Sequence, residues 1–283
     1  MNAKPSSLLF CPGHRSDRFE KGLTACPEGI VLDLEDGVGI ADKATARREV
    51  FNWLSKRSQQ PAVNLAVIGL RINAPQSTEG LEDIYSLAHA EGLPEKGWFF
   101  IPKLEDVGEL AWVTAHLHRR LPKWGICGLV ETGRGIRNLA RLAASQPALV
   151  ALGFGGADLR ADLGLSNNFE AQLYARSRFV LEASGFGLHL MDVPHLAINA
   201  PKELQEECIR VKALGFHGKF AIHPNQVQII TNTFAPSTNQ IEQAQRVITA
   251  YRSAGGNAVQ IDGQMIDEPV YQHALATLAK LPT

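Results

Sequence analysis

The sequence predicts a (β/α)8 (TIM) barrel with a C-terminal helical extension, and three observations favour this α/β fold class. Apolar runs of strand length alternate with helical patterns through eight units. Charged side chains gather where the apolar runs end, which is the face on which such barrels carry their active sites. The length of 283 residues is normal for one barrel, and no repeat or linker divides the chain. We expect the barrel over residues 1–232 and the extension over 233–283.

The composition excludes several classes of function. The chain is 45% hydrophobic and 20% charged, as in globular proteins, and its formal net charge is −1. We therefore expect no nucleic-acid partner and no membrane association. No apolar run approaches the roughly 20 residues that span a bilayer. The four cysteines are scattered, and residues 1–7 lack the apolar core of a signal peptide, which together indicate a cytoplasmic protein with free thiols.

The first four predicted strands are short apolar runs that end in polar loops. They occupy residues 7–11, 29–34, 65–72 and 98–101. Asp17 is a candidate N-cap for a helix that reaches Leu23, and Asp42 opens a second helix over 43–56. Further helical patterns cover 79–90 and 106–120. Each strand is thus followed by a helix, as the barrel requires.

The next two predicted strands are each followed closely by a carboxylate. Residues 125–130 lead into Glu131, and residues 148–154 lead through two glycines to Asp158. Because both acids follow consecutive strands, they can point into one crevice, where carboxylate oxygens suit a hard cation such as Mg²⁺. The alternative is that Glu131 caps the following helix, expected over 136–144, and that Asp158 is an ordinary loop residue.

The last third of the chain changes pattern. A loop over 160–168 is followed by predicted helices at 169–183 and 201–214 and predicted strands at 187–191 and 219–222. Pro201 favours a helix start at its position. Beyond residue 225 the alternation stops. We expect helices over 238–253 and 269–281, with an extended turn or hairpin over 259–267 between them.

Polar and charged side chains collect at the predicted strand ends, which favours a functional site at this face. They are His14, Arg15, Asp33, Glu35, Asp36, Arg71, Asn73, Lys103, Glu131, Asp158, Asp192 and His223. Simpler interpretations remain for several of them. Arg71 can form a salt bridge with Glu35 or Asp36, and those acids can serve only to orient Arg71 or a water molecule. Lys103 fits a structural lysine paired with a carboxylate, and His223 fits a hydrogen-bonded loop histidine.

Nine short motifs occur in order along nearly the whole chain. They are LFCPGHR (9–15), LDLED (32–36), RIN (71–73), PK (102–103), ETGRG (131–135), FGGAD (154–158), YARSR (174–178), GK with IHP (218–224) and DGQMID (262–267). In this order they resemble the citrate lyase β-subunit-like branch of the HpcH/HpaI aldolase superfamily. The resemblance implies a (β/α)8 barrel, a homo-oligomer that is usually a trimer, and Mg²⁺ as cofactor.

The resemblance also assigns roles to residues. It implies that Glu131 and Asp158 hold the metal and that Arg71 holds the substrate's carboxylate or carbonyl oxygen. The loop that ends at Arg15 is implied to lie near the phosphates of a CoA-type thioester, although Arg15 can instead be an exposed surface charge. Asp267 matches an aspartate that reaches a neighbouring subunit's active site, and it is our candidate for the base. The apolar faces of an extension that a closed barrel does not need favour the same contact between subunits.

The resemblance implies the reaction as well. We expect a Mg²⁺-dependent carbon–carbon lyase acting on a 3-hydroxyacyl thioester such as citramalyl-, malyl- or citryl-CoA, giving an acetyl thioester and an oxo-acid. The expected substrate contacts are Arg71, Glu131, Arg15, Glu35 and Asp36. Ala157 stands where the family usually has an acidic residue, and residues 193–199 also depart from its pattern. An aldolase on free 4-hydroxy-2-oxo acids and a citrate lyase subunit acting on an acyl-carrier-protein thioester therefore remain as alternatives.

Overall fold

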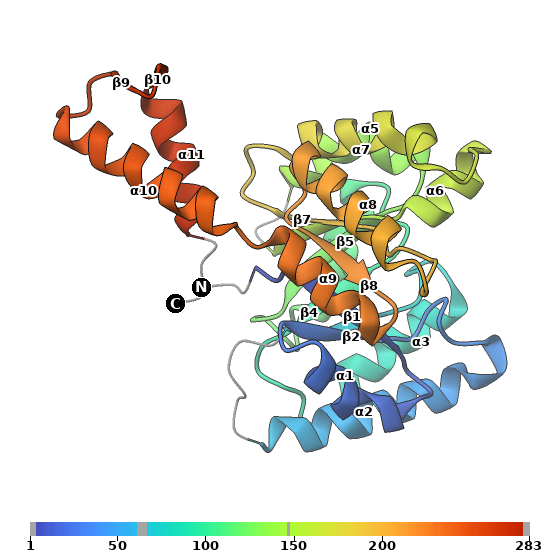
Figure 1. The fold of residues 1–283 in the computed structure, drawn as a ribbon. Helices are drawn as coiled ribbons and strands as arrows, with labels where there is room; N and C mark the ends of the chain where they lie inside the picture. The colour runs from blue at the N-terminus through green and yellow to red at the C-terminus, as the bar shows by residue number, and fades with distance from the viewer. Residues whose placement is uncertain (1–3, 61–66, 146–147, 280–283) are drawn as a thin grey trace. The chain divides into compact units, whose positions relative to one another are not determined.

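Eight parallel strands close into a barrel in the part of the chain that the computed structural model describes, residues 4–60, 67–145 and 148–279 (Figure 1). The strands are β1 (Ser7–Pro12), β2 (Gly29–Asp33), β3 (Val67–Arg71), β4 (Trp98–Ile101), β5 (Gly125–Val130), β6 (Leu149–Phe154), β7 (His189–Asp192) and β8 (Gly218–Ala221). They neighbour one another in sequence order, and β1 pairs with β8 to complete the ring. The predicted fold class is therefore confirmed.

Helices follow the strands and surround the barrel (Figure 1). They are α1 (Phe19–Ala25), α2 (Lys43–Ser58), α3 (Thr78–His89), α4 (Val107–Leu117), α5 (Gly133–Ala143), α6 (Gly156–Leu163), α7 (Phe169–Ala183), α8 (Pro201–Leu214) and α9 (Pro224–Phe234), with single 3-10 turns η1 (Ser16–Arg18) and η2 (Ile40–Asp42). The bounds of α7 and α8 match the prediction, because Asn168 caps the first and Pro201 opens the second. Helix α9 follows β8 where the sequence pattern had indicated none.

Two local predictions were wrong. Asp17 caps no helix, because its carboxylate pairs with Arg15 and α1 begins two residues later without a side-chain cap. Residues 156–163 form α6 where we expected a loop from residue 160, so Asp158 lies in the first turn of a helix. A helix of two turns between glycines is too short to show a clear apolar period, which is why the sequence concealed it. The predicted start of the third strand at residue 65 falls outside the described residues.

Aromatic side chains fill the barrel interior beneath the strand ends. The rings of Phe10 and Phe220 meet edge to face with centroids 5.3 Å apart, and Phe100 lies 6.0 Å from Phe220. Gly153 makes room for this packing, since a Cβ there would lie 2.8 Å from the Phe220 ring. The guanidinium of Arg71 lies over Phe10 at 5.0 Å from the ring centroid, so the core directly supports a charged residue at the barrel mouth.

The chain divides into two compact units, Met1–Thr231 and Asn232–Thr283. The second contains α10 (Thr238–Ser253), the antiparallel hairpin of β9 (Val259–Ile261) and β10 (Gln264–Ile266), and α11 (Glu268–Leu278). Its apolar side chains pack together, with the rings of Tyr251 and Tyr271 stacked at 4.7 Å. The predicted hairpin between two helices is thus present. Nowhere in the described ranges is a helix both long and apolar enough to cross a bilayer.

Candidate active site

Arg71 is fixed at the barrel mouth by a carboxylate on the neighbouring strand. Asp33 and Arg71 are register partners at the ends of β2 and β3. Arg71 donates from Nε to Asp33 Oδ1 at 2.6 Å and from Nη2 to Oδ2 at 2.7 Å. This two-point contact holds the planar guanidinium in one orientation. Each terminal nitrogen carries two N–H bonds, so a donor on each remains for a bound ligand.

The loop after β2 is shaped by Asp33 as well. The Asp33 carboxylate accepts the backbone N–H of Glu35 and that of Gly37, each at 2.9 Å. A Cβ at Gly37 would lie 2.4 Å from Asp33 Oδ2, so only glycine allows this close approach. Lys43 fastens the same loop by donating to the carbonyls of Leu34 and Glu35, both at 2.7 Å. The loop is therefore held by buried polar contacts on both sides.

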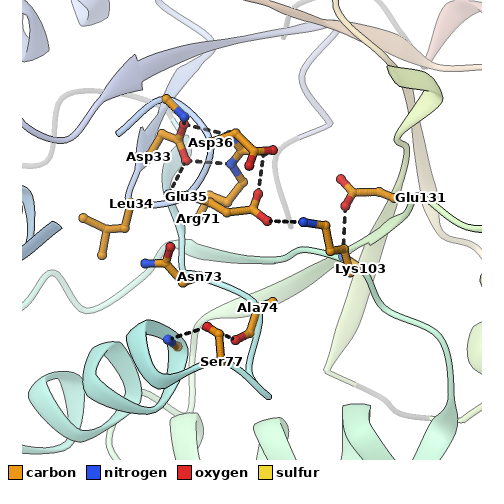
Figure 2. A network of polar contacts seen from close by, with 12 residues as sticks. Asp33, Leu34, Glu35, Asp36, Arg71, Asn73, Ala74, Ser77, Lys103 and Glu131 are labelled. Carbon is orange, nitrogen blue, oxygen red and sulfur yellow. Dashed lines mark hydrogen bonds and ion pairs between the residues drawn. The ribbon is translucent and has the colours of Figure 1, made fainter. Parts of the chain in front are cut away.

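Glu35 turns its carboxylate toward the centre of the mouth, where two cations meet it (Figure 2). Its Oε2 lies 2.9 Å from Nη1 of Arg71, and its Oε1 lies 3.5 Å from Nζ of Lys103. The side chain is buried, yet neither oxygen accepts a hydrogen bond of good geometry from any described residue. Buried carboxylate oxygens that lack donors are uncommon, and they mark a place where a ligand or water completes the site.

Glu131 lies across the mouth from Arg71, directly after β5 (Figure 2). Its Oε2 accepts the backbone N–H of Lys103 at 3.1 Å. Lys103 adopts a left-handed backbone with φ of 52°, a conformation that is uncommon for residues other than glycine and that aims this N–H at the carboxylate. Gly155 packs on the other side, since a Cβ there would lie 2.1 Å from Cγ of Glu131. Thr132, rather than Glu131, caps α5.

The charged groups in this cluster shift one another's pKa values. Burial raises the pKa of Glu131 to about 8, and the negative charges of Glu35 and Asp158 act in the same direction. Burial likewise raises the pKa of Glu35 to about 7, although Arg71 opposes the change. Burial disfavours the charged form of Arg71, but Asp33 and Glu35 outweigh it and raise its pKa, so the guanidinium stays charged. Displaced pKa values of this kind cluster at functional sites.

The donors present fit a magnesium ion held by few protein ligands. Asp158 lies in the first turn of α6, near enough for its charge to act on both Glu131 and Lys103. Its carboxylate forms no hydrogen bond or ion pair with a residue in the described ranges. No cluster of three or more His, Cys, Asp or Glu side chains arranged for a metal occurs among those residues. Magnesium typically uses one or two carboxylates and completes its shell with water and substrate, which matches Glu131 with Asp158.

Other predicted site residues lie in different surroundings. Asp36 is exposed, and its Oδ2 is 3.9 Å from Nη1 of Arg71. Arg15 pairs with Asp17 and contacts none of the buried cluster. Asp267 belongs to the second unit, where its Oδ1 accepts the N–H of Val270 and caps α11.

Two residues of the predicted strand-end group serve structure instead. Asp192 is fully buried and pairs with Arg176 at 2.9 Å and with Lys219, so its carboxylate faces the helix layer. The ring of His223 accepts the N–H of Asn225 at 3.2 Å, as a loop histidine does.

Asp33 is the residue whose role the sequence concealed most. It stood in the strand-end group, but its two-point grip on Arg71 was not anticipated. The sequence offered a partial signal, because an acid and an arginine end consecutive predicted strands, but the register that pairs them is seen only in the structure. Lys43, which connects the loop to Asn73 Oδ1 at 2.6 Å, lies at a helix start and offered no signal of this role.

Comparisons with known proteins show the family to which the chain belongs. Residues 6–224 match the HpcH/HpaI aldolase/citrate lyase family. A citrate lyase subunit beta-like protein of Deinococcus radiodurans is 34% identical over 289 residues, covering 99% of each chain. Human mitochondrial citramalyl-CoA lyase is 29% identical over 291 residues, which cover 96% of this chain and 84% of that one. The crystal structure of CitE from Mycobacterium tuberculosis with magnesium, acetoacetate and coenzyme A superposes with a TM-score of 0.81, at 32% identity and 99% coverage of both chains.

The fold and the site together define an enzyme of the barrel class, with charged groups assembled at the carboxyl ends of the strands. The chain belongs to the HpcH/HpaI aldolase/citrate lyase family. Its relatives are citrate lyase β-like proteins and citramalyl-CoA lyases, and it is accordingly a carbon–carbon lyase.

Proposed function

We propose that this protein is a Mg²⁺-dependent lyase that cleaves a 3-hydroxyacyl-CoA-type thioester into an acetyl thioester and an oxo-acid. The observation that carries the proposal is the buried cluster of Arg71, Glu35 and Glu131 at the barrel mouth. A fixed guanidinium beside carboxylates that are short of donors suits a substrate with its own carboxylate and an oxygen that gains negative charge. The relatives named for citramalyl-CoA and citrate cleavage support this substrate class.

In the proposed site, Glu131 and Asp158 hold the metal ion. When bound, Mg²⁺ supplies a Lewis acid for the oxygen atoms of the oxo-acid. Two carboxylates nearly neutralise its charge and leave other positions for substrate and water. The low exposure of Glu131, 4% of its surface, keeps bulk water away from this point.

Arg71 is the proposed catalytic and substrate-binding donor. Its free N–H bonds stabilise the oxygen that becomes negative as the carbon–carbon bond breaks, or grip the carboxylate beside it. Because Asp33 already orients the guanidinium, little reorganisation is needed when the charge develops. Glu35 lies against the same guanidinium and is proposed to touch the substrate or its water, with Asp36 at the outer edge.

Arg15 is proposed to meet the phosphates of the thioester carrier. Its side chain is 40% exposed in the loop between β1 and α1, and its partner is the still more exposed Asp17. An exposed ion pair of this kind contributes little to stability, so a phosphate can displace it at small cost.

Two parts of the proposal, the base and the oligomeric state, involve a second copy of the chain. We assign the base to Asp267, reaching the mouth of a neighbouring copy in a homotrimer. Met265, in the hairpin two residues before it, is a large apolar side chain with 69% of its surface exposed, which favours contact with another chain. We also place the protein in the cytoplasm, supported by four free, buried thiols.

A mixing experiment tests the role of Asp267 in trans. Asp267→Ala and Glu131→Gln subunits are combined after exchange has been verified by native mass spectrometry. Some interfaces then join an intact mouth to an intact hairpin, so part of the activity returns. Exchange without recovery contradicts the assignment.

A substrate panel tests the function itself. Citramalyl-, malyl- and citryl-CoA are incubated with protein and Mg²⁺, and products are read by mass spectrometry, with Glu131→Gln as the inactive control. Free 4-hydroxy-2-oxo acids and an acyl-carrier-protein thioester are included. Cleavage of either of these in preference to every CoA thioester would replace the proposal with the corresponding alternative.

A further inference from the structure

A second cavity lies outside the cluster at the barrel mouth. It has a volume of about 420 Å³, and its lining residues belong to α6, α7, α8, the segment before α7 and the loop after β7. Figure 1 labels these helices and β7. Its lining begins at Gly156 and Ala157, just before Asp158, but it contains none of the residues that form the Arg71–Glu131 cluster. A cavity of this volume is within the range that holds small-molecule ligands.

One wall of the cavity is a buried arginine, Arg176, that has one nitrogen without a hydrogen-bond partner among the described residues. The Arg176 side chain is only 4% exposed, and its Nε donates to Asp192 Oδ1 at 2.9 Å. Its guanidinium lies 4.7 Å from the centroid of the Phe169 ring. No described residue offers an acceptor to its Nη1. A buried guanidinium N–H without an acceptor is costly, so its retention indicates that a ligand supplies one.

The surrounding carboxylates leave Nη1 of Arg176 without an acceptor. The carboxylate of Asp192 is shared with the buried Lys219, which also pairs with Glu207. Glu207 in turn contacts Nδ1 of His195 at 3.1 Å. Asp192 is thus shared between Arg176 and Lys219, and Glu207 is engaged by Lys219 and His195.

The outer lining carries both signs of charge. Arg160 and Arg210 line the cavity, and Arg210 pairs with Glu170. Glu203 and Glu206 are exposed carboxylates at the rim. Because solvent screens exposed charges far more than buried ones, these outer groups act on the interior of the cavity less than buried Arg176 and its partner Asp192 do.

We propose that this cavity is a second binding site, which takes a small organic carboxylate. The carboxylate accepts from Nη1 of Arg176, and the hydrocarbon part rests on Val193, Pro194 and Leu196. The apolar lining favours an organic acid over inorganic phosphate, which has no hydrocarbon part to bury. This site does not depend on the lyase reaction proposed above.

Calorimetry tests the proposal. The Glu131→Gln protein is used in EDTA, so that no carboxylate binds through the metal. Benzoate and propionate are titrated into this protein, and their neutral isosteres, benzamide and propionamide, are titrated in separate runs. We expect the carboxylates to bind at least about tenfold more tightly than the amides, because a charged acceptor forms a stronger hydrogen bond with the buried guanidinium than a neutral one does. Equal affinity for acid and amide, or no binding of either, overturns the site.

Paired substitutions in the same protein locate the binding. Arg176→Lys keeps the charge that pairs with Asp192 but loses the planar guanidinium and its several N–H donors. It is expected to weaken benzoate binding about tenfold or more. Ala157→Glu places a negative charge in the lining and is expected to do the same, whereas Ala157→Gln, of equal size, weakens binding less. If Arg176→Lys does not fold, as judged by circular dichroism, the Ala157 pair decides. Unchanged affinity in Ala157→Glu, or equal losses in both Ala157 variants, contradicts the proposal.

Discussion

Binding of Mg²⁺ should be coupled to loss of a proton from Glu131. With its pKa raised to about 8, this carboxyl is ionised in only about one metal-free molecule in ten at pH 7. A metal ion needs the ionised form, so binding must expel the proton. The apparent affinity for Mg²⁺ should therefore rise about tenfold per pH unit up to pH 7 and level off above pH 9.

The size of the effect follows from the environment of Glu131. Displacement of its pKa from 4.5 to about 8 corresponds to on the order of 5 kcal/mol of preference for the neutral form. Because the folded pKa lies above the unfolded one, this preference stabilises the metal-free protein fully below about pH 4.5. The contribution is lost as pH rises through 8. Added Mg²⁺ should therefore stabilise the fold most at alkaline pH.

Calorimetry in two buffers of different ionisation enthalpy, PIPES and Tris, measures the proton release directly. We expect nearly one proton per Mg²⁺ at pH 7 and almost none at pH 9.5. Glu131→Gln should abolish this release. Glu35→Gln removes a nearby negative charge, lowers the pKa of Glu131 and moves the whole profile to lower pH. Affinity independent of pH between 5 and 9, or equal proton release in Glu131→Gln, would refute the reasoning.

Three further substitutions test the geometry of the site. Arg71→Lys keeps the charge but loses the fork, so kcat/KM should fall on the order of 10²-fold or more, and near-normal kinetics would make Arg71 a structural ion pair. Asp33→Asn should destabilise the fold by roughly 3 to 5 kcal/mol in urea unfolding, because a buried guanidinium loses its partner; a change below about 1 kcal/mol contradicts this. Gly155→Ala should weaken Mg²⁺ binding about tenfold, since the new Cβ displaces Glu131, whereas Gly39→Ala, with no neighbour nearer than 4.0 Å, should not.

The sequence by itself determined the fold class and the face that carries the site. Apolar runs of strand length alternate with helical patterns, and this alternation indicates parallel strands with helices between them. The carboxyl ends of such strands meet at one edge of the barrel. This is why the sequence predicts that Arg71 and Glu131 lie at the same face of the barrel. Local signals also determined helix ends, as at α10, where Ser237 and Gln240 form a capping box.

The tertiary structure alone decided which polar groups meet. Asp33 and Arg71 are 38 residues apart in sequence, and only the register of β2 against β3 joins them. The left-handed backbone of Lys103 arises from packing at the mouth, since local preference opposes it. Asp192 ends a strand as Glu131 follows one, yet its side chain points to the helix layer and pairs with Lys219. Strand neighbours and the direction of each side chain depend on contacts between distant segments, which a single sequence does not specify.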